Sequence, residues 1–175
     1  MLRRLLKFII RPIAEPGIEI AYRTCVAQAR QSAFYAELHA PDTVDGRFDV
    51  LILHVLLVIL HLAQHSQQTQ QLFDILFADM DKNLREMGVS DMRISKKMKP
   101  LLAAFYGRAK IYEQALAGND TELAEALRRN IYGDSAASAE DIGRLVNYIR
   151  RAHAALAAQT DETLLAGTLA FPTVI

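Results

Sequence analysis

The sequence predicts an all-α fold, a single-domain bundle of about six to seven helices. Three observations support this: apolar residues recur at spacings of three and four, strand-like alternation is almost absent, and Pro and Gly separate the periodic segments. With 175 residues, of which 51% are hydrophobic and 23% charged, the chain can bury one core without disulfides. We expect residues 16–175 to form the helical domain and residues 1–15 a basic amphipathic arm.

The first predicted helix begins at Pro16, where the missing N–H of proline costs nothing. It is expected to reach about Leu38 and to end before the Ala40-Pro41-Asp42 turn. The second runs from about Asp45 to Gln64, and its centre at 50–63 is apolar nearly all round. Because a membrane span needs roughly 20 such residues, we expect a central helix buried on every side.

Two amphipathic helices follow. The first covers Gln67–Met87 and is ended by Gly88. Ser95 is expected to cap the second, which reaches about Ala117 and carries Pro100 in its first turns, where a local bend is expected.

Three further helices complete the predicted bundle. They are expected at residues 120–132, at 138–158 and within 160–175. The 120–132 helix ends at Gly133, and Ser138 with Asp141 three residues later forms a near capping box for the next.

Charge is balanced overall, with 20 basic and 20 acidic residues, which argues against a specific nucleic-acid binder. Four cations nevertheless lie among apolar residues at the start of the chain, a composition suited to an anionic membrane surface: Arg3, Arg4, Lys7 and Arg11. An equally weighted alternative to membrane contact is that this segment packs on the domain and leaves its charged side chains at the surface. The apolar part of this segment is too short for us to expect a cleaved signal peptide.

Catalytic and cofactor signatures are missing from the sequence. No nucleotide-binding loop or nucleophile elbow occurs, and the single cysteine, Cys25, is expected in the core. His54, His61 and His65 could share a helical face, but no accompanying Glu or Cys completes a metal-ligand pattern. We therefore expect no enzymatic activity, no cofactor and no metal.

The stretch LFDILFADMDKNLREMGVSDMRISKKMKPLLAAFYGRAKIYEQAL at residues 72–116 resembles the ubiquinol-cytochrome c chaperone family. The matching elements are the F-x-DMD-x-x-LREMGV block from Phe77 to Val89, the Met98-Lys99 pair and the FYGR block from Phe105 to Arg108. Two features depart from the family pattern. Pro100 stands where an ordinary helix-forming residue is expected, and the long targeting extension of mitochondrial members is missing. The second departure indicates a bacterial homologue.

The resemblance implies a non-enzymatic assembly chaperone that binds newly synthesised cytochrome b and assists assembly of the ubiquinol-cytochrome c reductase, complex III. It also implies a ribosome contact or a small helical partner, and a place in the bacterial cytoplasm at the cytoplasmic face of the inner membrane. The sequence leaves two alternatives open: a peripheral membrane scaffold, and a haem- or metal-binding helical protein.

We expect a hairpin of the two amphipathic helices to bind the client, with an apolar surface and a polar rim. The eleven residues of the 72–116 stretch that we expect to contact client or partner are Phe73, Phe77, Asp79, Asp81, Arg85, Glu86, Lys96, Lys99, Phe105, Tyr106 and Arg108.

Overall fold

The computed structural model describes residues 14–175 except residue 136, and no strand occurs among them. The predicted all-α class is confirmed, and each of the seven predicted helical regions contains a helix. The elements are α1 (Pro16–Ala29), α2 (Ala33–Ala36), α3 (Val44–His61), α4 (Ser66–Glu86), α5 (Asp91–Ala117), α6 (Asp120–Leu127), the π-helical turn η2 (Arg128–Tyr132), α7 (Ala139–Ala157) and α8 (Asp161–Leu165). The cations predicted for the arm lie outside the described residues.

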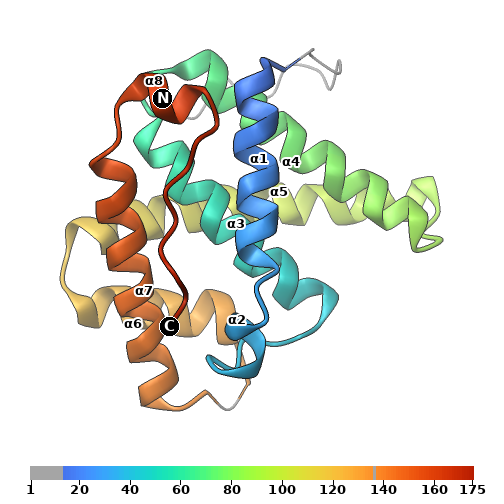
Figure 1. Ribbon diagram of the computed structural model, residues 1–175. Helices are drawn as coiled ribbons and strands as arrows, with labels where there is room; N and C mark the ends of the chain where they lie inside the picture. The colour runs from blue at the N-terminus through green and yellow to red at the C-terminus, as the bar shows by residue number, and fades with distance from the viewer. Residues whose placement is uncertain (1–13, 136) are drawn as a thin grey trace.

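Helix α3 occupies the centre of the bundle, as its all-round apolar sequence predicts (Figure 1). Thr43 caps its start by accepting a hydrogen bond from the Gly46 N–H at 3.1 Å. Every residue from Val50 to Val58 is buried, and α1, α4, α5, α7 and η2 all pack against the helix. In the described part of the chain, no helix is long and apolar enough to cross a membrane.

One buried polar network ties α3 to its neighbours. The imidazole of His54 lies 2.7 Å from the Val50 carbonyl oxygen and 2.8 Å from the Tyr148 hydroxyl on α7. The Gln28 amide of α1 donates to the same hydroxyl at 2.9 Å. Burial lowers the pKa of His54 to about 4. The ring is therefore neutral at pH 7, donating from Nδ1 to the carbonyl and accepting at Nε2 from the tyrosine.

The prediction of one helix over residues 16–38 is wrong, because the chain turns a corner at Arg30–Ser32. Hydrogen bonds between residues three apart, as in a 3₁₀ turn, close the corner. In one of them, the Gln31 N–H donates to the Gln28 carbonyl at 3.1 Å. It directs Phe34 into the core, where the ring packs edge-on against His54 and Tyr148 at centroid distances of 5.2 and 5.0 Å. Burial of this aromatic ring compensates for the broken helix.

Helices α4 and α5 form an antiparallel hairpin whose far end projects from the bundle (Figure 1). Gly88, predicted to end α4, adopts a left-handed φ of 78°. The prediction that Ser95 caps the next helix is wrong, since α5 already begins at Asp91. Pro100 thus lies in the helix interior, where its missing N–H leaves the Lys96 carbonyl without its helical partner.

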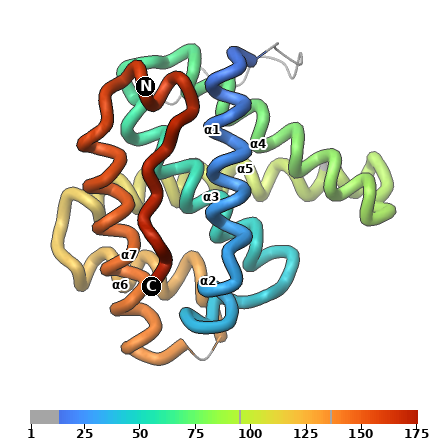
Figure 2. Tube along the Cα trace, viewed as in Figure 1, coloured from blue at the N-terminus to red at the C-terminus, as the bar shows by residue number. Residues whose placement is uncertain are grey.

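The C-terminal elements close the bundle over α1. Ser138 and Asp141 form the predicted capping box of α7. Helix α8 packs on α1 so closely that a Cβ at Gly17 would lie 1.9 Å from the Leu165 carbonyl oxygen. The segment after α8 then runs between α1 and α7 (Figure 2), and the Gln28 amide donates to the Pro172 carbonyl at 3.1 Å.

The neutral state of His54 makes stability pH-dependent. Between the folded pKa of about 4 and the ordinary value of 6.5, the unfolded chain binds the proton that the folded chain refuses, so stability is lost as pH falls through this window. We expect His54 to account for a loss of roughly 3 kcal/mol between pH 7 and pH 4. Urea unfolding of wild type and His54→Gln across this range measures the difference, and equal pH dependence of the two proteins would contradict it.

Candidate functional site

The aromatic residues predicted to contact a client lie inside the α4–α5 hairpin. Phe73, Phe77 and Phe105 are buried and Tyr106 is half-buried. The ring centroids of Phe73 and Phe77 lie 4.5 Å apart, and Phe105 stands edge-on to both at 5.3 and 5.7 Å. Such a cluster holds the two helices in register.

Three of the predicted polar residues take part in ion pairs near the far end of the hairpin. Arg85 pairs with Asp81 at 2.7 Å and also with Asp91 at the start of α5. Glu86 pairs with Lys82 at 3.7 Å. Of these exposed pairs, only Arg85–Asp91 bridges the turn between the helices, whereas the other two lie within α4. Each contributes little to stability.

Arg108 has a different partner, Asp49 of α3, at 2.6 Å. The two side chains are only 19% and 23% exposed. Burial raises the pKa of the Asp49 carboxyl, and the adjacent guanidinium counteracts that rise. The pair therefore fixes the hairpin to the central helix.

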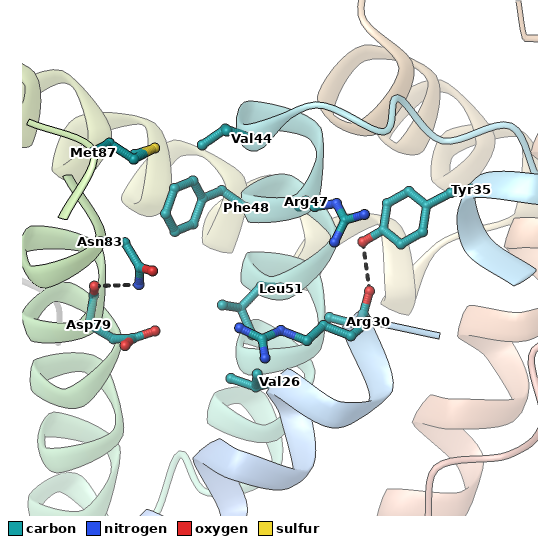
Figure 3. A pocket seen from close by; sticks show the side chains of 11 residues that line it. Val26, Arg30, Tyr35, Val44, Arg47, Phe48, Leu51, Asp79, Asn83 and Met87 are labelled. Atoms are coloured by element: carbon teal, nitrogen blue, oxygen red, sulfur yellow. Dashed lines mark hydrogen bonds between the residues drawn. The ribbon is translucent and has the colours of Figure 1, made fainter. Parts of the chain in front are cut away.

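A groove lies where the hairpin meets the bundle, between α4 on one side and α1, α2 and α3 on the other (Figure 3). Its volume is about 360 Å³, and Val26, Phe48 and Leu51 supply apolar surface to it. Two apolar side chains on its rim are unusually open to solvent, Val44 at 51% and Met87 at 50%. The groove therefore presents apolar surface that the fold leaves uncovered.

Asp79, one of the predicted residues, forms part of the α4 wall of this groove (Figure 3). Its carboxylate accepts a hydrogen bond from the Tyr22 hydroxyl at 2.7 Å. Burial, followed by this hydrogen bond, raises the pKa of Tyr22. Asn83 donates to the Asp79 backbone carbonyl at 2.7 Å. The acid is thus held in a fixed position beside apolar surface.

Two arginines place positive charge on the α1–α3 wall of the groove, across from Asp79. Arg47 pairs with Asp42 at 2.6 Å and lies over the Tyr35 ring at 5.3 Å. Arg30 is exposed at the α1 corner, and no carboxylate of the described residues lies within ion-pair distance of it. A second hollow of about 290 Å³ shares Arg30, Tyr35 and Arg47 with the groove, which extends the surface toward α2.

Sequence reasoning found one residue of the groove and missed the others. Val44 and Phe48 lie four residues apart just before the apolar run, a spacing that places both on one face of a helix. This spacing is the one sequence signal for the floor and rim of the groove. Arg30 and Tyr35 gave no such signal, because the first helix was predicted to continue past them. Lys96 and Lys99, in contrast, are exposed on α5 and do not line the groove.

The three histidines of the metal alternative have separate partners. His54 bonds to Tyr148, His61 lies 3.1 Å from the His153 ring nitrogen, and His65 lies 2.8 Å from Asp161. Among the residues that the structure describes, no group of three or more His, Cys, Asp or Glu side chains is arranged to hold a metal ion.

Comparison with known proteins finds a family match and a similar solved structure. The family model described as ubiquinol-cytochrome C chaperone matches residues 36–171. A crystal structure of the Cbp3 homologue from Brucella abortus superimposes with a TM-score of 0.80 at 35% identity, covering 90% of each chain.

Similarity also extends to animal proteins. The chain is 25% identical over 148 residues to the mouse ubiquinol-cytochrome c reductase complex assembly factor 1, covering 82% of this chain and 50% of the relative. The Xenopus laevis protein of the same name is 24% identical over 134 residues, covering 74% and 67%. The chain thus spans about half the length of the mouse relative.

The Arg108–Asp49 pair yields a stability prediction. Changing Arg108→Met leaves the Asp49 carboxylate half-buried without its partner, and we expect the free energy of unfolding to fall by about 2 kcal/mol. Asp49→Asn should cost a similar amount, and the double variant less than the sum of the two. Urea denaturation of the four proteins measures this coupling; strictly additive losses would show that the pair is not coupled.

Proposed function

Because this chain belongs to the ubiquinol-cytochrome c chaperone family, we propose that it is a non-enzymatic chaperone that binds newly synthesised cytochrome b and assists assembly of complex III. The observation that carries the proposal is the groove between α4 and the α1–α3 corner. It combines uncovered apolar surface with fixed charges at its two sides, as a site for a helical client segment requires.

The apolar residues of the groove account for client binding. Cytochrome b is a membrane protein, so its segments expose apolar side chains before they pack together. Val26, Phe48 and Leu51 offer these side chains an apolar surface, and the open rim residues Val44 and Met87 enlarge it. Transfer of apolar surface from water into the groove drives the association.

The charges on the walls give the bound segment a direction. Asp79 on α4 favours a basic flank of the client, and Arg30 at the α1 corner favours an acidic flank. Because Tyr22 holds the Asp79 carboxylate in place, little side-chain entropy is lost when a partner binds.

The remaining predicted residues act mainly by positioning. In this proposal the phenylalanine cluster and the Arg85 ion pairs keep α4 in place, so that its groove wall keeps its shape. Lys96 and Lys99 do not line the groove and take no part in the proposed client contact. A ribosome or a small helical partner is a further contact of this proposal. In a bacterium, the protein would then work at the cytoplasmic face of the inner membrane, where cytochrome b is made and inserted.

The groove is tested by adding charge to its rim. We expect Val44→Glu combined with Met87→Glu to reduce capture of cytochrome b at least tenfold, because an apolar segment would then bury carboxylates. The measurement is recovery of radiolabelled cytochrome b, translated in vitro, on the tagged full-length chain.

Ile20→Glu is the matched control, since Ile20 is 48% exposed on α1 and does not line the groove. It should capture cytochrome b as the wild type does. If the control variant and the double variant lose capture equally, or if neither does, the groove is not the client site.

The charges on the groove walls allow a second, independent measurement. Asp79→Asn retains an oxygen that can accept from Tyr22, so we expect the fold to be kept. The Asp79→Asn variant should bind a fluorescent apolar peptide with lysines at one end several-fold more weakly than the wild type does. The Arg30→Gln variant should show the same loss of affinity for an apolar peptide with glutamates at one end. Unchanged affinity of both variants for both peptides would refute a directed binding mode.

A further inference from the structure

The solvent face of α5 carries a run of positive charge that the groove does not use. From Met92 to Tyr112 the sequence contains six cations and no acidic residue. Arg108 forms the ion pair with Asp49 described above. The other cations of this run are all exposed: Arg93, Lys96, Lys97, Lys99 and Lys110.

Nearby acids do not neutralise this face. Those at the far end of the hairpin are engaged by cations of α4, since Arg85 holds Asp81 and Asp91 and Lys82 holds Glu86. Within the described residues, no carboxylate lies in ion-pair distance of the exposed α5 cations. Four of these cations therefore leave a concentrated positive potential over residues 93–99.

An apolar side chain stands at the edge of the same surface. Met92 is 72% exposed at the start of α5, where the hairpin projects farthest from the bundle (Figure 1). Buried Ile94 and half-buried Met98 mark the opposite side of this helix. An exposed methionine beside several lysines on a projecting helix is the arrangement of a protein surface that lies on a lipid bilayer.

We propose that the basic face of α5, residues 92–99, docks the protein onto an anionic phospholipid membrane. The lysine ammonium groups pair with lipid phosphates while the Met92 side chain enters the interface. RNA fits this face less well, because none of the described residues at 92–110 is an exposed aromatic on which a base could stack.

Docking in this way leaves the groove accessible. The groove lies against α4 and the α1–α3 corner, whereas the cations point to the side of α5 opposite its packed residues. The groove and the basic face therefore lie on different helices of the hairpin. Apolar segments of a membrane protein would then be bound at the surface into which they insert.

Sedimentation of the full-length chain with vesicles tests the proposal. We expect binding to vesicles of phosphatidylcholine with phosphatidylglycerol and none to phosphatidylcholine alone, with loss of binding in high salt. Combining Lys96→Gln, Lys97→Gln and Lys99→Gln should lower the partition coefficient about 100-fold.

The matched control removes the same number of charges elsewhere on the surface. Arg23→Gln, Arg128→Gln and Arg129→Gln are exposed substitutions on α1 and η2 and should change binding by no more than about threefold. Equal losses in the two triple variants, or no loss in the lysine variant, would overturn the proposal. So would wild-type binding to a single-stranded RNA but not to the anionic vesicles.

Fluorescence can report the contact itself, because the chain contains no tryptophan. In Met92→Trp we expect a blue shift of the emission on anionic vesicles and quenching by brominated lipid, whereas Ile20→Trp should show neither. If vesicles leave the emission of the Met92→Trp variant unchanged, the proposed contact is wrong. The lysine triple variant should capture cytochrome b as the wild type does, so failure of the groove and failure of this surface are separately visible.

Discussion

The fold depends on covering a helix that is apolar on every side. Residues 50–58 of α3 are all buried, and no single neighbour could cover them, so the chain surrounds this helix with α1, α4, α5, α7 and η2. The one buried polar side chain within that run, His54, adds specificity to the apolar contacts. Its ring accepts a hydrogen bond from the Tyr148 hydroxyl of α7, and that hydroxyl in turn accepts one from the Gln28 amide of α1. Three helices are thereby fixed relative to one another.

The groove exists because the surrounding helices cover the first turns of α3 less completely than its middle. The first turns of α3 are less covered than its middle, which leaves Val44 exposed and Phe48 half-buried. Gly46 permits the chain before α3 to fold back closely, since a Cβ there would lie 2.1 Å from the Pro41 carbonyl oxygen. The corner before α2 then positions Arg30 and Tyr35 on the α1–α3 wall. One helix thus supplies both the floor of the groove, at residues 44–51, and the centre of the buried core, at residues 50–58.

Sequence periodicity predicted the helical regions because each amphipathic helix must turn its apolar stripe inward, and the Ser138–Asp141 capping box could be read directly. The corner at Arg30–Ser32 could not, since it contains neither Pro nor Gly and depends on burial of Phe34 against residues far along the chain. The same limit applies to the site. Periodicity shows which residues share a face, but not which neighbour covers that face. Hence Phe73 and Asp79 belong to one sequence pattern, although one lies inside the hairpin and the other on the groove wall.

The closure of α1 by the far end of the sequence constrains when this protein can fold. Gln28 bonds to the carbonyl of Pro172, a separation of 144 residues, and α8 rests directly on Gly17. A chain emerging from the ribosome can form the α4–α5 hairpin early, because its contacts are local. The core around α1 has to wait until residue 172 has been synthesised, so α1 must persist with part of its apolar face uncovered during most of translation. The protein thus passes through an incompletely packed state, which lasts until the contacts between α1 and the C-terminal segment can form.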